Sequence, residues 1–300
     1  MAGVPQTLQI PPPVSIQTML YNTYLQIIGG GNTPFVGPLD ALVAQGAMIR
    51  HASSVRRLRS AYTGPACRLR GNGANAEADI AFLPDGTLDL TAAAAIAADS
   101  GGTQANWVTA YDQFQNTDAT QLTTGNQMQF GTTFQSRGEM GGSAASNRTL
   151  GLDLQALPQP TFFSIVANQA SITGTRVLLG TSSNSLNRFT RMSGTLPQQN
   201  WGTTLAGTSI SPGKHVYGFL SNGSSSQIYI DGNLNATGDA GNTQLEMSNA
   251  RIGGNQSTTS NWNNTAGNTI SEVIVFSSNP TTLPGWPAFV AAQKTYFGIP

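Results

Sequence analysis

Four tight-turn dipeptides constrain this chain more than any other feature of its sequence. Asn or Asp stands directly before Gly at Asn72-Gly73, Asp85-Gly86, Asn222-Gly223 and Asp231-Gly232. Such pairs tolerate the positive φ angles that tight hairpin turns require. The clearest hairpin joins residues 214–220 to residues 227–230. The sequence therefore predicts half-buried antiparallel strands connected by short turns.

The composition also favours an all-β fold. Charged residues are 9% of the 300 residues, against about a quarter in an average domain, which excludes coiled coils and charge-driven disorder. The 34 Gly and 16 Pro indicate many short strands and turns. Two helices are predicted, over 91–98 and over 284–297, the second with Thr282 as N-cap and Gly298 as terminator. Further strands are predicted at 67–69, 107–111, 161–167, 176–180, 250–252 and 270–276.

Residues 1–37 differ from the rest and are predicted to form an N-terminal docking arm, followed by one domain over 38–300. The apolar residues of the arm fit a helical stripe, although strand-like alternation fits too. The predicted docking residues are Ile16, Leu20, Tyr24 and Ile27. A disordered terminus is the alternative, but so apolar a segment favours docking onto a partner or a neighbouring subunit.

Charge and cysteine usage exclude several classes of function. The formal net charge is zero, so the chain as a whole has no field that would steer nucleic acid or an anionic membrane to it. Cys67 is the single cysteine and there are two histidines, which predicts no internal disulfide, no zinc site and no cofactor. No apolar run approaches the length of a membrane span. The first residues lack a basic start and an apolar core, so we expect no secretory signal and synthesis in the cytosol.

Two groups of charged residues have both a functional and a structural interpretation. Glu77 and Asp79 share one strand face and could hold calcium or act as paired acids, but a solvated or salt-bridged face is the favoured interpretation. Asp112 is predicted to form a structural ion pair with Arg68 or Arg70. These two arginines belong to a basic cluster, for which structural pairing is favoured, a protein interface is second and nucleic acid is disfavoured. The cluster is Arg50, Arg56, Arg57, Arg59, Arg68 and Arg70.

Tryptophans beside asparagines are candidate sugar platforms. An aromatic plate next to amide donors and acceptors suits the flat face and hydroxyl edge of a sugar. The alternative is a structural tryptophan at the rim that covers the end of the domain. This alternative is favoured for Trp107, and the two interpretations are equally weighted for Trp201 and Trp262. The carbohydrate-binding candidates are Trp201, Asn255, Trp262 and Asn263. Cys67 and His215 could be a nucleophile and a base, but a core thiol and a strand residue are the favoured interpretation.

Several segments together resemble a known family. Residues 54–70, 76–80 and 107–113, and then 215–232, 250–253, 270–276 and 296–299, resemble the laminin-G-like, concanavalin A-like domains of bacteriophage structural proteins. Those domains are similar to the catalytic domain of fungal arabinofuranosidase B. The resemblance spans roughly residues 40 to 299 and implies a two-sheet antiparallel jelly-roll sandwich.

The same resemblance identifies where catalytic carboxylates are expected. A retaining glycosidase needs two, and the acid/base run of those enzymes matches residues 253–257, where Asn255 replaces the proton donor. The nucleophile is expected upstream, yet no acid lies between Asp153 and Asp231. The sequence therefore predicts that the chain is not an enzyme, a prediction that turnover dependent on Asp231 or Asp239 would contradict.

The function expected from these observations is that of a non-enzymatic bacteriophage virion protein. It would be a decoration, cement or fibre-like component of capsid or tail, made in the host cytoplasm and anchored by its arm. Its expected partners are other virion proteins and copies of itself, with a trimer as the expected oligomer. A lectin-like module for surface glycans is the alternative function.

Overall fold

The structure of the chain is a computed structural model. It describes residues 34–131, 137–141, 148–170, 174–181, 188–242, 245–246, 249–254, 262 and 267–300. Val36–Pro300 form one compact unit. In the described part of the chain no helix is long and apolar enough to cross a bilayer.

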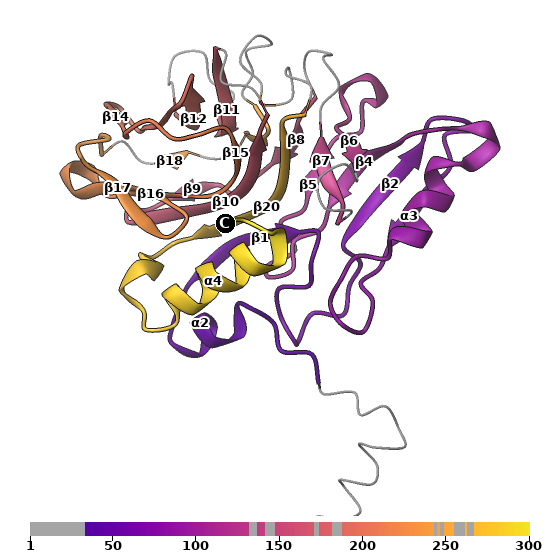
Figure 1. The fold of residues 1–300 in the computed structure, drawn as a ribbon, viewed down its shortest axis with the longest axis horizontal. Coiled ribbons are helices and arrows are strands. Elements are labelled where there is room, and N and C mark those ends of the chain that lie inside the picture. Colours follow the sequence, from indigo (N-terminus) through magenta and orange to yellow (C-terminus); the bar gives the residue numbers. More distant parts are fainter. Residues whose placement is uncertain are drawn as a thin grey trace, which may run out of the picture. The chain divides into compact units, whose positions relative to one another are not determined.

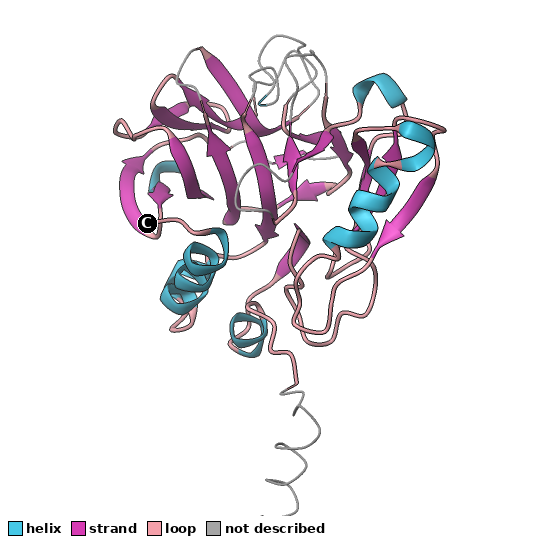
Figure 2. Ribbon diagram, turned by 45° about the vertical axis from the view of Figure 1, so that its right-hand side comes forward, coloured by secondary structure: helices cyan, strands magenta, loops and turns pink. Residues whose placement is uncertain are grey.

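Strands dominate the described residues and helices are few (Figure 2). The α-helices are α2 (Asp40–Ala44), α3 (Leu90–Ala97) and α4 (Trp286–Phe297). The strands are β1 (Ile49–Ser54), β2 (Cys67–Gly71), β3 (Glu77–Ile80), β4 (Ala105–Ala110), β5 (Ala119–Thr120), β6 (Gln129–Gly131), β7 (Glu139–Gly141), β8 (Leu150–Leu152), β9 (Ala156–Leu157), β10 (Thr161–Gln169), β11 (Thr175–Gly180), β12 (Phe189–Ser193), β13 (Leu196–Asn200), β14 (Thr204–Ala206), β15 (Gly213–Ser221), β16 (Ser226–Ile230), β17 (Asn233–Gly238), β18 (Leu245–Glu246), β19 (Ala250–Ile252) and β20 (Thr269–Phe276).

Eighteen of these strands join into one antiparallel sheet. One half runs β17-β16-β15-β10-β20-β1, and the other runs β14-β13-β12-β11-β19-β8-β5-β4-β2-β3. Strands β7 and β6 connect the halves, because β7 pairs with β20 and β6 pairs with both β7 and β4. The result is a nearly closed barrel (Figure 1). The all-β prediction is confirmed, whereas two separate jelly-roll sheets are not.

The predicted strands and hairpin turns are present where the sequence placed them. All six isolated strand predictions coincide with β2, β4, β10, β11, β19 and β20. At the β16–β17 turn, Asp231 and Gly232 have φ of 53° and 85°, as a type I′ hairpin turn requires. The Asn222-Gly223 turn is longer than a two-residue turn, because a 3-10 turn over Gly223–Ser225 lies between β15 and β16.

The two predicted helices are present, and their ends differ from expectation by one or two residues. The Asp89 carboxylate accepts a hydrogen bond from the Ala92 N–H at 2.9 Å, so α3 begins one residue early with a side-chain cap. Thr282 does not cap α4, because it lies in a separate 3-10 turn and Gly285 is the N-cap residue. Gly298 ends α4 in the left-handed conformation, as predicted.

Buried charged groups lie between α4 and the sheet. The Glu272 carboxylate of β20 accepts hydrogen bonds from Arg56 Nε at 2.7 Å and from Arg56 Nη2 at 3.1 Å. It also accepts from the Ser54 hydroxyl and from Gln293 Nε2 of α4, both at 2.8 Å. Both charged side chains are 5% exposed or less. This network joins β1, β20 and α4 at one point.

Candidate functional site

The register of four neighbouring strands places an arginine between two glycines. Thr120 of β5 pairs with Gly151 of β8, Gly151 pairs with Arg251 of β19, and Arg251 pairs with Gly180 of β11. Directly opposed residues of antiparallel strands point to the same face of a sheet. Their neighbours along β8 and β19 are buried in the core: Leu150, Leu152, Ala250 and Ile252. The Arg251 row therefore lies on the outer face, with no side chain on either flank of Arg251.

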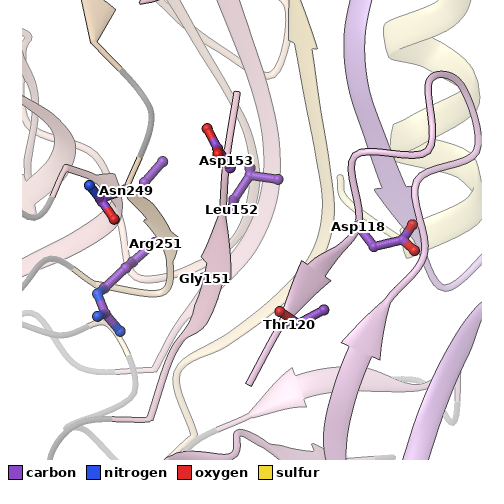
Figure 3. Close-up of a pocket in the computed structure, with 8 residues that line it drawn as sticks. Asp118, Thr120, Gly151, Leu152, Asp153, Asn249 and Arg251 are labelled. Atoms are coloured by element: carbon purple, nitrogen blue, oxygen red, sulfur yellow. The ribbon is translucent and has the colours of Figure 1, made fainter. Parts of the chain in front are cut away.

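A pocket of about 250 Å³ lies on this face (Figure 3). We name it the Arg251 pocket, and its lining residues are Asp118, Thr120, Gly151, Leu152, Asp153, Asn249, Ala250 and Arg251. Figure 3 shows β8 in the middle, with Asn249 and Arg251 on one side and Thr120 and Asp118 on the other. The lining combines one cation, two carboxylates, an amide and a hydroxyl, which is a mixture of hydrogen-bond donors and acceptors.

The Arg251 guanidinium keeps part of its hydrogen-bonding capacity. Nη1 donates to the Thr149 hydroxyl at 3.2 Å, and Nε is buried without a hydrogen-bond partner among the described residues. Asp153 accepts from the Gln155 N–H at 3.1 Å through Oδ1. Burial shuts Nε off from the pocket, so a ligand would reach the guanidinium through its other nitrogens.

Asp118 is held in the pocket by a loop that Asp112 organises. Asp112 accepts hydrogen bonds from four backbone N–H groups, those of Ala52, Phe114, Gln115 and Thr117, at 2.8–3.0 Å. The Asp112 N–H in turn donates to Asp118 Oδ1 at 2.8 Å. Burial lowers the pKa of the adjacent His51, although the charges of Asp112 and Asp118 oppose this shift. Asp112 thus fixes the conformation of the loop that follows it.

The predicted ion pair of Asp112 with Arg68 or Arg70 is wrong. Arg68 Nε contacts Asp79 Oδ1 at 2.8 Å, and Arg70 pairs with Glu77 across the β2–β3 ladder. Asp112 is 2% exposed, and backbone donors satisfy it. The interpretation of Glu77 and Asp79 as a salt-bridged face is confirmed, and the described residues contain no cluster of three or more metal-ligating side chains.

The tryptophans predicted as sugar platforms are buried. Trp201 and Trp262 are 0% exposed. Trp201 stacks on Phe163 with ring centroids 5.3 Å apart, and the Trp262 Nε1–H donates to the Thr269 carbonyl at 3.1 Å. Neither ring offers a face to solvent, so both act as core residues. Trp107 is likewise buried, at 1%.

The remaining chemical candidates have structural partners. Cys67 is fully buried, and burial raises the pKa of its thiol far above the usual range. His215 Nδ1 lies 2.7 Å from Asp231 Oδ2 on the adjoining hairpin. In the basic cluster, Arg56 pairs with Glu272 and Arg59 lies over the Phe114 ring at 4.3 Å.

Several predicted residues lie outside the described part of the chain. They are the docking residues Ile16, Leu20, Tyr24 and Ile27, and the sugar candidates Asn255 and Asn263. The anchoring arm, the virion role and the oligomer therefore stay predictions.

Comparisons with solved structures identify similar folds. A glycoside hydrolase family 54 α-L-arabinofuranosidase with 4-nitrophenyl α-L-arabinofuranoside matches with a TM-score of 0.64 and 15% identity. An arabinofuranosidase with arabinofuranosyl-α-1,2-xylobiose matches at 0.60 and 14%. Each match covers 86% of this chain and, respectively, 66% and 65% of the other, so the chain spans just under two thirds of those enzymes. No family model and no curated protein matches.

These matches support one part of the sequence-based resemblance and correct another prediction. The likeness to arabinofuranosidases holds at the level of fold, whereas nothing supports the bacteriophage part. The prediction that the chain is not an enzyme is overturned, because the matching structures are glycoside hydrolases. The sequence analysis also did not consider Asp118 and Asp153, which the structure places in one pocket.

Sequence reasoning missed the Arg251 pocket altogether. Its only local signal was a small or charged residue between two buried ones, in Leu150-Gly151-Leu152 and Ala250-Arg251-Ile252. The two segments are about 100 residues apart, and only the β8–β19 register brings them together.

Proposed function

We propose that the protein recognises carbohydrate, and that the Arg251 pocket holds one sugar unit. The observation that carries this proposal is the polar pocket beside Arg251, where Gly151 of the neighbouring strand has no side chain to fill the space. Sugar hydroxyls both donate and accept hydrogen bonds, so they suit a site that mixes guanidinium, carboxylate, amide and hydroxyl groups. The arabinofuranosidase-like fold agrees with this class of ligand, as an analogy only.

Binding of saccharides to matched variants tests the proposal. Arg251→Met removes the guanidinium, and we expect at least about a tenfold loss of affinity, which corresponds to about 1.4 kcal/mol. Gly151→Val fills the pocket and should abolish binding; its Cβ would lie 3.3 Å from the Thr120 carbonyl oxygen, a contact that a small shift relieves. Arg68→Met is the control, because Arg68 belongs to the same sheet but does not line the pocket.

The same samples are assayed for release of 4-nitrophenol from aryl glycosides. A glycosidase needs two carboxylates, and Asp118 and Asp153 are the two that line the Arg251 pocket. Asp118→Asn and Asp153→Asn therefore identify which groups any turnover depends on. Saccharide binding that Arg251→Met and Gly151→Val leave unchanged would refute the assignment of this pocket.

A further inference from the structure

A second and larger cavity lies among loops that do not contribute to the Arg251 pocket. Its volume is about 620 Å³, within the range of small-molecule sites. Its residues come from the segment before β10, the β13–β14 turn, the β15–β16 turn and the segment after β17. We name it the Asp239 basin, and it is lined by Gln159, Gly202, Thr203, Asn222, Gly223, Ser224, Asp239, Gly241 and Asn242.

Hydrogen bonds between these loops fix the shape of the Asp239 basin. The Ala240 carbonyl accepts from the N–H groups of Trp201 and Thr203 at 2.7 and 3.2 Å. Gln159 Nε2 donates to the Ser221 hydroxyl at 3.0 Å and to the Gly241 carbonyl at 3.2 Å. Gly241 has a φ of 90°, and a Cβ there would lie 2.4 Å from the Trp201 carbonyl oxygen, so only glycine allows this approach. The shape of the basin is therefore preformed and does not depend on a bound ligand.

The polar groups around the basin are largely unused. Asp239 accepts from the Gly241 N–H through Oδ1 at 2.7 Å, and none of the described residues donates to its Oδ2. The side chains of Asn222, Ser224 and Asn242 are exposed and form no hydrogen bond with the described part of the chain. Within the described part of the chain, the cavity thus presents one carboxylate oxygen, two amides and the Ser224 hydroxyl without a hydrogen-bond partner.

The chemistry of the lining selects one class of ligand. Among the described residues, no Lys, Arg, His or aromatic side chain lines the Asp239 basin, and Asp239 is the one charged residue that does. Phosphate and carboxylate ligands would meet a carboxylate and no cation, and an apolar ligand would meet no apolar side chain. A neutral sugar fits, since its hydroxyls can donate to Asp239 and exchange hydrogen bonds with the amides.

We infer that the Asp239 basin is a second carbohydrate-binding site, specific for uncharged sugars. It lies on different loops from the Arg251 pocket and uses a different set of side chains. The inference goes beyond the proposed function, because the basin can bind sugar whether or not the Arg251 pocket does. Two sites on one domain would raise the avidity for a polysaccharide.

Saturation-transfer difference NMR on the full chain tests the inference. The probes are glucose, galactose, mannose, arabinose and N-acetylglucosamine, each alone in EDTA and again with calcium. In Asp239→Asn the Oδ1 contact with the Gly241 N–H can persist while the free carboxylate oxygen becomes an amide donor. We expect this variant to lose at least about ten-fold in affinity. Ser224→Trp, at an exposed position, should block the basin without touching the core.

The Arg251→Met variant separates this inference from the proposed function. Sugar binding that survives Arg251→Met, and is lost when Asp239→Asn or Ser224→Trp is added to that variant, supports a second site. Binding to the Arg251→Met variant that Asp239→Asn and Ser224→Trp leave intact overturns it, as does the absence of binding to every probe. A signal that appears only with calcium also overturns it, because the basin would then be a cation site.

Discussion

Glu272→Gln is expected to destabilise the protein by about 3–5 kcal/mol, the usual cost of breaking a buried ion pair from one side. The change is isosteric, so it creates no cavity and tests the charge and hydrogen bonds alone. The Glu272 carboxylate accepts two hydrogen bonds from Arg56, one from Ser54 and one from Gln293. Gln in its place has a single acceptor oxygen and leaves the Arg56 cation buried without a counter-charge.

Equilibrium urea unfolding, followed by tryptophan fluorescence, measures this effect. With a denaturant slope of about 3 kcal/mol/M, the loss moves the midpoint down by about 1 M or more. Asp79→Asn is the matched control, because it makes the same carboxylate-to-amide change at an arginine pair whose side chains are 43% and 41% exposed. Water replaces the lost contact there, so its midpoint should stay within the scatter of repeats. Equal shifts for Glu272→Gln and Asp79→Asn would refute the reasoning that burial sets the size of the effect.

Three further outcomes follow from the contacts described. Burial lowers the pKa of His215, but the hydrogen bond with Asp231, the Asp231 charge and the Ser211 carbonyl together outweigh burial and leave the pKa raised. The stability difference between wild type and His215→Gln should therefore be largest below about pH 6.5 and shrink as pH rises above it, measured by Tm across that range. Cys67 should resist iodoacetamide at pH 8 in the native protein and react fully in denaturant, by mass spectrometry, and native labelling would contradict its burial. Asp112→Ala leaves four backbone N–H groups without their acceptor and should cost about 2 kcal/mol or more in the same urea assay, whereas a loss below about 0.5 kcal/mol would contradict its role in the loop.

Local sequence patterns predicted the longer strands, the tight turns and the helices α3 and α4, but not the short strands such as β5 to β9. The Asp231-Gly232 pair supplied the positive φ angles of its turn, and Gly298 supplied the left-handed end of α4. These features depend on the conformational preferences of one or two residues. The pairing of Arg68 and Arg70 with Asp79 and Glu77 could also have been predicted from the sequence. A short connection joins β2 and β3, so neighbouring strands bring these charges together.

The candidate sites depend on contacts between residues far apart in the chain. Trp201 and Trp262 stand among polar residues in the sequence, yet both are buried, since strand pairing elsewhere closes the core around them. Asp112 precedes a loop whose backbone N–H groups donate to its carboxylate, so Asp112 does not need Arg68 or Arg70 as a counter-charge.

The sequence by itself determined the all-β class, the positions of β2, β4, β10, β11, β15, β16, β19 and β20, several turns and the likeness to the arabinofuranosidase fold. Only the tertiary structure decided which side chains share a face. Alternation along β8 and β19 sets which residues point outward, but not that Gly151 lies beside Arg251 or that Gly180 lies on its other flank. That placement is a matter of register between strands that are distant in sequence, and shifting one strand by a single residue would turn its side chains to the opposite face.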